Sequence, residues 1–140
     1  MMEIRPYEPG DEAAVVALWQ ECGLTRPWND PHKDIERKLA VQPELFLVGV
    51  VDGAVVASVM AGYEGHRGWV NYLAVAPRFR AHGFARRLMR RVEELLLARG
   101  CPKVSLLVRS SNSQALAFYQ HLGYLPDESI SLGKRLIADA

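Results

Sequence analysis

The chain has 140 residues, a size typical of one domain, and no linker or low-complexity tract interrupts it, so we expect residues 1–140 to form a single domain. Hydrophobic residues make up 49% and charged residues 24%, which excludes a disordered chain. The 17 basic and 16 acidic residues give a net charge of +1, too little for the broad positive field of a nucleic-acid-binding protein.

The two cysteines, Cys22 and Cys101, lie far apart and have no partner at metal-ligand spacing, so we expect neither a metal site nor a disulfide framework. No stretch of about 18 apolar residues occurs, and the N-terminal residues lack an apolar run behind a positive start. We therefore expect a cytoplasmic protein without membrane association. A sheet edge or a helix could pair subunits, but no pattern in the sequence selects one.

The first part of the chain predicts one short strand and two helices. Residues 3–7 have the pattern of a strand, a Pro-Gly pair then turns the chain, and Asp11 can N-cap a helix. A loop between two prolines at 25–31 separates this helix from a second one over about 32–41. The apolar residues of the first helix recur at helical spacing and predict its core face: Val15, Leu18, Trp19 and Cys22.

Three apolar runs then predict an antiparallel meander. Residues 45–51 and 54–63 are rich in β-branched side chains and are joined by Asp52-Gly53, the pair that a type I′ hairpin turn favours. A polar turn leads into a third strand over 69–75.

The second half of the chain predicts a helix between two parallel strands. Residues 83–99 have the spacing of a long amphipathic helix that Gly100 ends, and residues 103–108 form a nearly all-apolar strand. A capping box at 111–114 opens another helix, and we expect a last strand over 130–136.

Together these elements predict an α/β (α+β) fold, with a mixed, mostly antiparallel sheet of about six to seven strands flanked by helices. The strand–helix–strand unit over 69–108 forces its two strands parallel and is nearly always right-handed. Ligands tend to bind at the carboxyl ends of strands where the strand direction changes, which directs attention to residues 76–86.

Small residues, Gly83 and Ala85, stand at the start of the long helix. Backbone N–H groups at a helix start lack partners, and short side chains let an anion approach them. Arg80 and Arg86 add positive charge to the same rim. Spacing alone leaves two interpretations open: a phosphate-binding loop, or a strand-to-helix loop whose glycine serves only the backbone geometry.

One six-residue segment, Arg80-Ala81-His82-Gly83-Phe84-Ala85, resembles the R/Q-x-x-G-x-G/A signature of the GNAT N-acetyltransferases. The resemblance extends over nearly the whole chain and is strongest to the YpeA-type bacterial members, through the loops 26–31 and 62–68 and the ending 131–136. Further matches lie before and after the signature: residues 73–77, Asn112, Ala115, Phe118-Tyr119 and Gly123-Tyr124.

The resemblance implies that the protein uses acetyl-CoA as its co-substrate. It implies backbone contacts from Leu73 and Val75 to the pantetheine arm and a contact from Asn112 near the amide arm. Tyr119 would point its hydroxyl at the sulfur, where a phenol can donate a proton to the leaving thiolate; without the resemblance, an ordinary core tyrosine is the simpler interpretation. The residues assigned to the pyrophosphate and its rim are Arg80, His82, Gly83, Ala85 and Arg86.

The general base and the acceptor site have less support in the sequence. Some GNAT enzymes place a glutamate at the start of the third meander strand, but no carboxylate occurs there. Glu64 and His66, in the turn before that strand, could act through a water, since burial can raise a glutamate pKa and histidine titrates near neutrality. The interpretation as solvated turn residues is favoured for both, and an amine that loses its proton to bulk water would need neither. Trp28, Asn29 and Asp30 could bind a cationic amine. A structural clasp explains them equally well, with Trp28 packed on the core and Asn29 or Asp30 capping the next helix.

We therefore expect an acetyl-CoA-dependent N-acetyltransferase that moves the acetyl group directly to a primary amine, on a small molecule or as the α-amine or a lysine of a protein. Direct transfer is favoured because neither cysteine lies in a motif of an acyl-carrying nucleophile. The alternative is a catalytically silent acyl-CoA-binding regulatory module, which the missing carboxylate favours and the retained Asn112 and Tyr119 disfavour. We expect no metal, nucleic acid or membrane as a partner.

Overall fold

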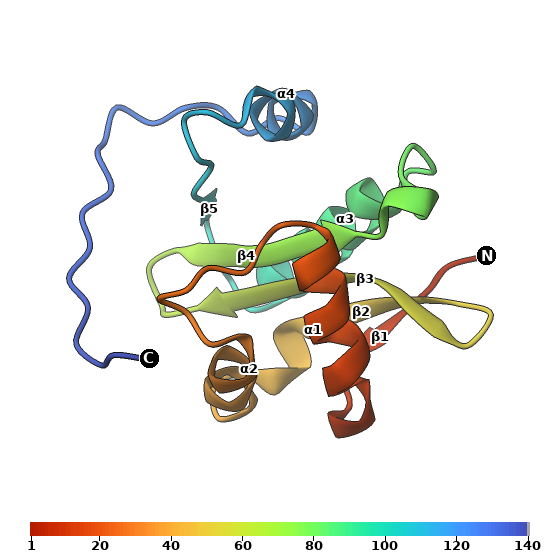
Figure 1. Ribbon diagram of the computed structural model, residues 1–140. Coiled ribbons are helices and arrows are strands. Elements are labelled where there is room, and N and C mark those ends of the chain that lie inside the picture. The colour runs from red at the N-terminus through yellow and green to blue at the C-terminus, as the bar shows by residue number, and fades with distance from the viewer. Residues whose placement is uncertain (140) are drawn as a thin grey trace.

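A mixed sheet flanked by helices forms the fold in the computed structural model, which describes residues 1–139 (Figure 1). The strands are β1 Glu3–Pro6, β2 Phe46–Val51, β3 Ala54–Tyr63, β4 Gly68–Val75 and β5 Val104–Leu106. They lie side by side in this order; β1 to β4 pair antiparallel, and β4 pairs parallel with β5. The helices are α1 Glu12–Glu21, α2 Pro31–Leu39, α3 Phe84–Ala98 and α4 Ser113–His121, with short 3-10 turns η1 Pro9–Asp11, η2 Pro43–Leu45 and η3 Pro77–Phe79.

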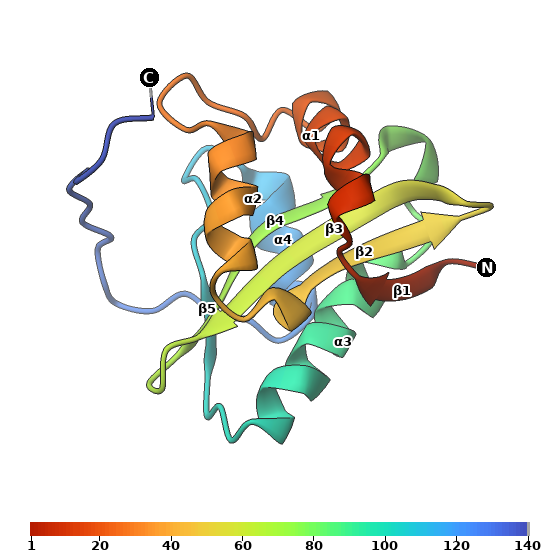
Figure 2. The ribbon, with the colours of Figure 1, turned by 90° about the horizontal axis from the view of Figure 1, so that it is seen from below.

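Helices cover both faces of the sheet. α1 and α2 lie on one face, and α3 crosses the opposite face (Figure 2). Because β3 runs between these layers, its residues from Val56 to Ala61 are all buried. A strand that is buried on both faces needs apolar side chains on both, which explains why all residues in this part of the sequence except Ser58 are apolar. The largest fully buried side chains include Trp19, Phe46, Ile35 and Leu88.

The structure confirms the central predictions. Asp52 and Gly53 both have positive φ, 50° and 80°, as a type I′ hairpin turn requires. The β4–α3–β5 unit is a crossover between parallel strands. Gly100, with φ of 80°, follows the C-cap of α3, where a left-handed residue ends a helix at low cost.

Three predictions near the C-terminus are wrong. The sheet has five strands and not six to seven, because residues 130–136 form no strand and their backbone has no partner strand in the described part of the chain. β5 extends only over residues 104–106 and not 103–108, since its pairing with β4 ends at Leu106. Asn112 caps α4 by accepting from the Ala115 N–H at 3.0 Å, in place of the capping box expected at 111–114.

The N-terminal helices differ from expectation in detail. Asp11 stands at the N-cap of α1 but makes no cap bond, because its carboxylate accepts from the Glu8 N–H at 2.8 Å and pairs with Arg5 at 2.8 Å. α2 ends at Leu39 and not at Val41. Within residues 1–139, no helix is both long enough and apolar enough to cross a membrane.

Candidate active site

A β-bulge bends β4 in the middle of its length. The register between β3 and β4 shifts between Ser58 and Met60, and Tyr72 takes a φ of 53°. Two hydrogen bonds hold this bend: Trp19 Nε1 donates to Ser58 Oγ at 2.9 Å in the buried core, and Ser58 Oγ donates to the Tyr72 carbonyl at 3.0 Å in a partly buried position. The Tyr72 ring stacks on Trp19 with centroids 3.7 Å apart, and its hydroxyl donates to Asp34 at 2.6 Å. Backbone and side chain of Tyr72 are thus both fixed in a conformation that few non-glycine residues adopt.

The bend separates β4 from β5. The two strands pair only from Gly68 to Val70 on β4, so the β5-facing edge of β4 has no strand partner beyond Val70. A cavity of about 700 Å³, the smaller cavity, opens along this free edge. Its walls come from β4, the segment between β4 and α3, and α4, with Leu73, Val75, Arg80, Gly83, Phe118 and Tyr119 among the lining residues.

The first turn of α3 presents free backbone N–H groups to the smaller cavity. Gly83 occupies the N-cap with a left-handed φ of 76°, and no side chain caps the helix. The N–H groups at a helix start have no intrahelical acceptor, and those from Gly83 to Arg86 find none elsewhere in residues 1–139. A Cβ at Gly83 would meet no heavy atom within 4 Å, so the space over this turn is open. Free N–H groups and the positive end of the helix dipole suit an anion such as a phosphate.

Basic side chains surround this turn. Arg80 is exposed and donates from Nε to the Val75 carbonyl at 3.3 Å, which holds its guanidinium at the wall of the smaller cavity. Arg86 is exposed and lines the same cavity. The His82 ring turns back onto its own loop, with Nδ1 2.8 Å from the Arg80 carbonyl, and does not line the cavity. His82 therefore stabilises the loop with its side chain.

α4 contributes an amide and a phenol to the same cavity. Asn112 uses Oδ1 to cap the helix, which leaves its NH₂ group available as a donor. The Tyr119 hydroxyl has no hydrogen-bond partner in the part of the chain that the structure describes. Burial raises the pKa of Tyr119 to about 12, so the phenol keeps its proton at neutral pH. It is a donor that still lacks an acceptor.

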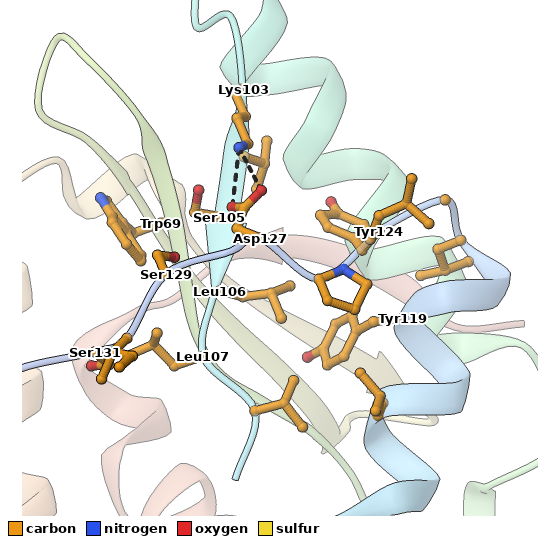
Figure 3. Close-up of a pocket in the computed structure, with 18 of the residues that line it drawn as sticks. Trp69, Lys103, Ser105, Leu106, Leu107, Tyr119, Tyr124, Asp127, Ser129 and Ser131 are labelled. Atoms are coloured by element: carbon orange, nitrogen blue, oxygen red, sulfur yellow. Dashed lines mark hydrogen bonds and ion pairs between the residues drawn. The ribbon is translucent and has the colours of Figure 1, made fainter. Parts of the chain in front are cut away.

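Tyr119 also lines a larger cavity of about 1130 Å³ (Figure 3). This larger cavity is bounded by β5, α4 and residues 125–132. Lys103 Nζ pairs with Asp127 at 3.0 Å beside it, and the Tyr124 hydroxyl donates to Glu93 at 2.5 Å. Within the described chain, Tyr119 is the one residue that lines both cavities.

Known proteins identify the family to which this arrangement belongs. The sequence matches the acetyltransferase (GNAT) family over residues 13–124. An acetyltransferase of Yersinia enterocolitica is 54% identical over 138 residues, which cover 99% of this chain and 98% of the relative. The chain belongs to the GNAT acetyltransferase family. An uncharacterized N-acetyltransferase of Yersinia pestis is 52% identical with the same coverage. The fold is shared with the PaiA N-acetyltransferase of Thermoplasma acidophilum, solved in complex with coenzyme A, at a TM-score of 0.81 and 17% identity over 93% of both chains.

GNAT acetyltransferases use acetyl-CoA, and the smaller cavity of this acetyltransferase has groups that fit it. The unpaired edge of β4 offers backbone partners to the amides of a pantetheine arm, and the first turn of α3 offers N–H groups to phosphate. The structure brings nearly all the residues predicted for acetyl-CoA to this one cavity. His82 is the exception, and the others are Leu73, Val75, Arg80, Gly83, Ala85, Arg86, Asn112 and Tyr119.

The structure does not bring Glu64 and His66 to either cavity of the acetyltransferase. The Glu64 carboxylate closes its own turn, accepting from the backbone N–H groups of Arg67 and His66, the latter at 2.7 Å, and from Trp69 Nε1 at 3.2 Å. Glu64 is exposed, and these hydrogen bonds, that from Arg67 foremost, lower its pKa. The upward shift expected of a buried base is therefore wrong for Glu64, which is held in its ionised form as a turn-stabilising group.

The predicted acceptor residues Trp28, Asn29 and Asp30, in the loop between α1 and α2, line neither cavity, and Asn29 and Asp30 contact the C-terminal residues. Trp28 is 52% exposed and does not pack on the core as the clasp interpretation expected. Asp30 does cap α2, since Oδ1 accepts from the His32 N–H at 2.9 Å. Asn29 Oδ1 accepts from the Arg135 guanidinium. Asn29 and Asp30 thus have structural partners, whereas the ring of Trp28 remains accessible.

Sequence reasoning missed the residues that shape the acetyltransferase site without lining it. Trp19 and Ser58 hold the bulge, and only Trp19 was assigned, as a core residue. A signal was present in the sequence: Ser58 is a polar residue inside an apolar strand, and a fully buried hydroxyl needs partners. Cys22 and Leu24 also line the smaller cavity, where the end of α1 approaches Val75.

Proposed function

We propose that this acetyltransferase moves an acetyl group from acetyl-CoA directly to a primary amine, on a small molecule or as the α-amine or a lysine of a protein. One observation carries the proposal. A single cavity joins the free N–H groups of α3, the unpaired edge of β4 and the unpartnered hydroxyl of Tyr119. We further propose that residues 1–140 act as one N-acetyltransferase domain of the YpeA type in the cytoplasm.

Different residues around the smaller cavity bind different parts of acetyl-CoA. The N–H groups of Gly83, Ala85 and Arg86, with that of His82 in the preceding loop, hold the pyrophosphate, and Arg80 adds charge at the rim. The backbone of Leu73 and Val75 faces the pantetheine arm. The Val75 carbonyl already accepts from Arg80 and from Cys22 Sγ at 3.4 Å, which leaves Leu73 as the freer backbone partner. The NH₂ group of Asn112 donates from the α4 side of the cavity.

Tyr119 acts as the donor to the leaving sulfur. Bound acetyl-CoA supplies an activated acetyl thioester. A phenol of pKa about 12 is a weaker acid than a thiol of pKa about 8.5, so Tyr119 stabilises a thiolate by donating a hydrogen bond and does not give up its proton fully. An unpartnered donor in the wall of the cavity needs no rearrangement to do this.

The acceptor amine must be neutral to attack, and the protein offers little help with its proton. Glu93 and Asp127, the carboxylates at the larger cavity, are engaged by Tyr124 and Lys103. The arrangement therefore favours an amine that is partly neutral at physiological pH, such as an α-amine of pKa about 8, over a lysine of pKa about 10.4. The accessible ring of Trp28 is a contact for a cationic acceptor before it reaches the cavity.

Tyr119→Phe tests the proposal. The variant removes only the hydroxyl, so acetyl-CoA affinity measured by calorimetry stays within about twofold, while turnover with a competent amine falls about a hundredfold, the scale for the loss of one preorganised hydrogen-bond donor. Tyr63→Phe is the matched control, because its hydroxyl lies outside both cavities, 3.3 Å from the Gly65 carbonyl. Turnover that is unchanged in Tyr119→Phe would remove Tyr119 from the mechanism. A folded wild-type chain that does not bind acetyl-CoA would refute the assignment of the smaller cavity.

A further inference from the structure

The last described residues lie beside α2 and the loop that leads into it, and the Asp139 carboxylate is bound there (Figure 2). Arg37 donates to both carboxylate oxygens, to Oδ1 at 2.6 Å and to Oδ2 at 3.5 Å, and the Asp30 N–H donates to Oδ2 at 2.8 Å. Arg135 brings a second guanidinium to 3.8 Å, and Lys33 donates to the Asp139 backbone carbonyl at 3.1 Å. A bidentate arginine is a common means of recognising a carboxylate. We call Arg37, Arg135 and the Asp30 N–H the carboxylate cradle.

Polar contacts at the surface hold Asp139 in the carboxylate cradle, and little apolar packing supports them. Leu136 and Ile137 are 87% and 67% exposed, and the side chains of Arg37 and Arg135 are half-exposed. The hydrogen bond from Arg37, foremost, lowers the pKa of Asp139 to about 2, so the cradle holds a full negative charge at neutral pH. Ion pairs of exposed arginines contribute little to stability. A carboxylate on a ligand can therefore compete with Asp139 for the same donors.

A group of opposite charge lies directly beside the carboxylate cradle. Asp34, on α2, accepts from the Tyr72 hydroxyl through Oδ2 at 2.6 Å. Its other oxygen, Oδ1, has within residues 1–139 only one long contact, to Arg37 Nη1 at 3.5 Å. The Asp34 side chain is 23% exposed, and a carboxylate has about four acceptor positions. Oδ1 of Asp34 can therefore accept the N–H groups of an amine.

The contact between Asp34 and Tyr72 connects this surface with the bulge in β4. Tyr72 has the positive φ at the bulge, and Leu73, the next residue, lines the smaller cavity. Asp139 Oδ2 and Asp34 Oδ1 each lie 3.5 Å from the same nitrogen, Arg37 Nη1, so the two oxygens are at most twice that distance apart. This span is about the length of two extended residues. One small molecule can thus reach both the carboxylate cradle and the carboxylate next to the bulge.

We propose that the acetyl acceptor is a primary amine that also carries a carboxylate: an amino acid or a short peptide, bound by its α-amine and its carboxylate. The carboxylate of the acceptor displaces Asp139 from the carboxylate cradle, and the amine donates to Asp34 Oδ1 next to the bulge. Asp139 occupies the cradle as an internal substitute when no acceptor is bound. This inference rests on the proposed N-acetyltransferase function and narrows its acceptor to one class.

The two charges of such an acceptor match the two charges of the surface. Asp34 accepts an N–H group from the charged or the neutral amine, and the neutral form attacks the acetyl carbon. The N–C bond forms as the C–S bond breaks, the amine proton passes to water, and coenzyme A leaves as a thiolate that receives the hydrogen bond from Tyr119. An amine without a carboxylate leaves Arg37 paired with Asp139 and gains nothing from the cradle. The cradle therefore discriminates between amines of equal basicity.

Two acceptors that differ only in the carboxylate test the inference: alanyl-alanine and its C-terminal amide, whose α-amines have similar pKa values. We expect kcat/KM of the wild type with acetyl-CoA to be at least about tenfold higher for the dipeptide, the scale of one hydrogen bond to a charged group. Arg37→Gln should remove this preference by lowering kcat/KM for the dipeptide and not for the amide. Arg91→Gln is the matched control and should keep the preference, because Arg91, on α3, is similarly exposed and also contacts a carboxylate three residues away in its own helix, Glu94 at 4.0 Å. Equal kcat/KM for the two acceptors in the wild type overturns the inference.

Calorimetry with alanyl-alanine in the presence of coenzyme A measures acceptor binding without turnover, because coenzyme A carries no acetyl group. Asp139→Asn removes the charge that competes for Arg37, so the dissociation constant of the dipeptide should fall at least about threefold, whereas a purely structural Asp139 would leave it unchanged or raise it. A constant that does not fall in Asp139→Asn overturns the inference, and so does a wild type that does not bind the dipeptide. A wild type that binds the dipeptide but transfers no acetyl group to any amine refutes the proposed function, whereas equal acetylation of dipeptide and amide refutes only the acceptor class.

Discussion

The bulge in β4 depends on one buried hydroxyl, and Ser58→Ala measures what that hydroxyl contributes. Ser58 and Trp19 are both fully buried. Removing Oγ leaves the Trp19 N–H without an acceptor, at about 1–3 kcal/mol, and removes a donor from the Tyr72 carbonyl, at about 1 kcal/mol. We therefore expect the free energy of unfolding to fall by about 2–4 kcal/mol, a large part of the roughly 5–15 kcal/mol of a typical domain.

A double-mutant cycle with Trp19→Phe isolates the hydrogen bond. In a chain that lacks the indole N–H, Ser58→Ala loses only its contact with Tyr72 and should cost about 1 kcal/mol. Urea unfolding of the wild type, the two single variants and the double variant gives the coupling energy, provided that all four show the same slope of unfolding free energy against urea concentration. If Ser58→Ala costs the same in both backgrounds, the Trp19–Ser58 bond does not stabilise the bulge. Because the bulge separates β4 from β5, acetyl-CoA affinity should fall together with stability in Ser58→Ala.

Two further predictions concern the first turn of α3 and the stability at low pH. Gly83→Trp should abolish acetyl-CoA binding in calorimetry, whereas Gly100→Trp at the other end of α3 should leave binding intact. The two glycines are matched, because both have a similar positive φ and open space around an added Cβ. An equal loss of binding in both variants would therefore point to backbone strain and not to a blocked site. The hydrogen bond from Arg5 lowers the pKa of Asp11, so the folded state favours its ionised form; this stabilisation is present above the unfolded pKa of about 3.9 and is lost as the pH falls through the lower folded pKa. Asp11→Asn should thus have a lower free energy of unfolding than the wild type at pH 7, and the difference should shrink in urea unfolding at pH about 3. The same difference in free energy at both pH values would contradict the stabilising role of the Arg5–Asp11 hydrogen bond.

Local signals in the sequence were sufficient for most of the fold. The Asp52-Gly53 pair specifies its turn because both residues tolerate positive φ, and the 3.6-residue spacing of α3 is independent of its neighbours. The crossover follows from topology, since parallel strands cannot be joined by a tight turn. Nearly all the residues that we predict to bind acetyl-CoA line one cavity, because they cluster at motifs that the fold brings together.

Other parts of the site depend on contacts that no local pattern contains. The bend at Tyr72 results from Trp19 on α1 and Ser58 on β3, which are 39 residues apart in sequence. Glu64 was a candidate base by its position, but two backbone N–H groups of its own turn and the Trp69 indole on β4 donate to its carboxylate. Whether a glutamate is buried or solvated is decided by packing, and its pKa follows that environment.

The strand that was expected over residues 130–136 shows a different limit of prediction from sequence patterns. Residues 130–136 have the pattern of a strand, and the structure shows them extended with apolar side chains in solvent. A pattern specifies which face of a segment must be covered, but it does not specify which chain supplies the cover. In the described part of the chain, the outer edge of β5 and the C-terminal segment both border the larger cavity, and Tyr119 lines this cavity and the smaller one. Local periodicity therefore predicts where a strand can form, whereas pairing with a neighbouring strand, which the pattern does not contain, decides whether it forms.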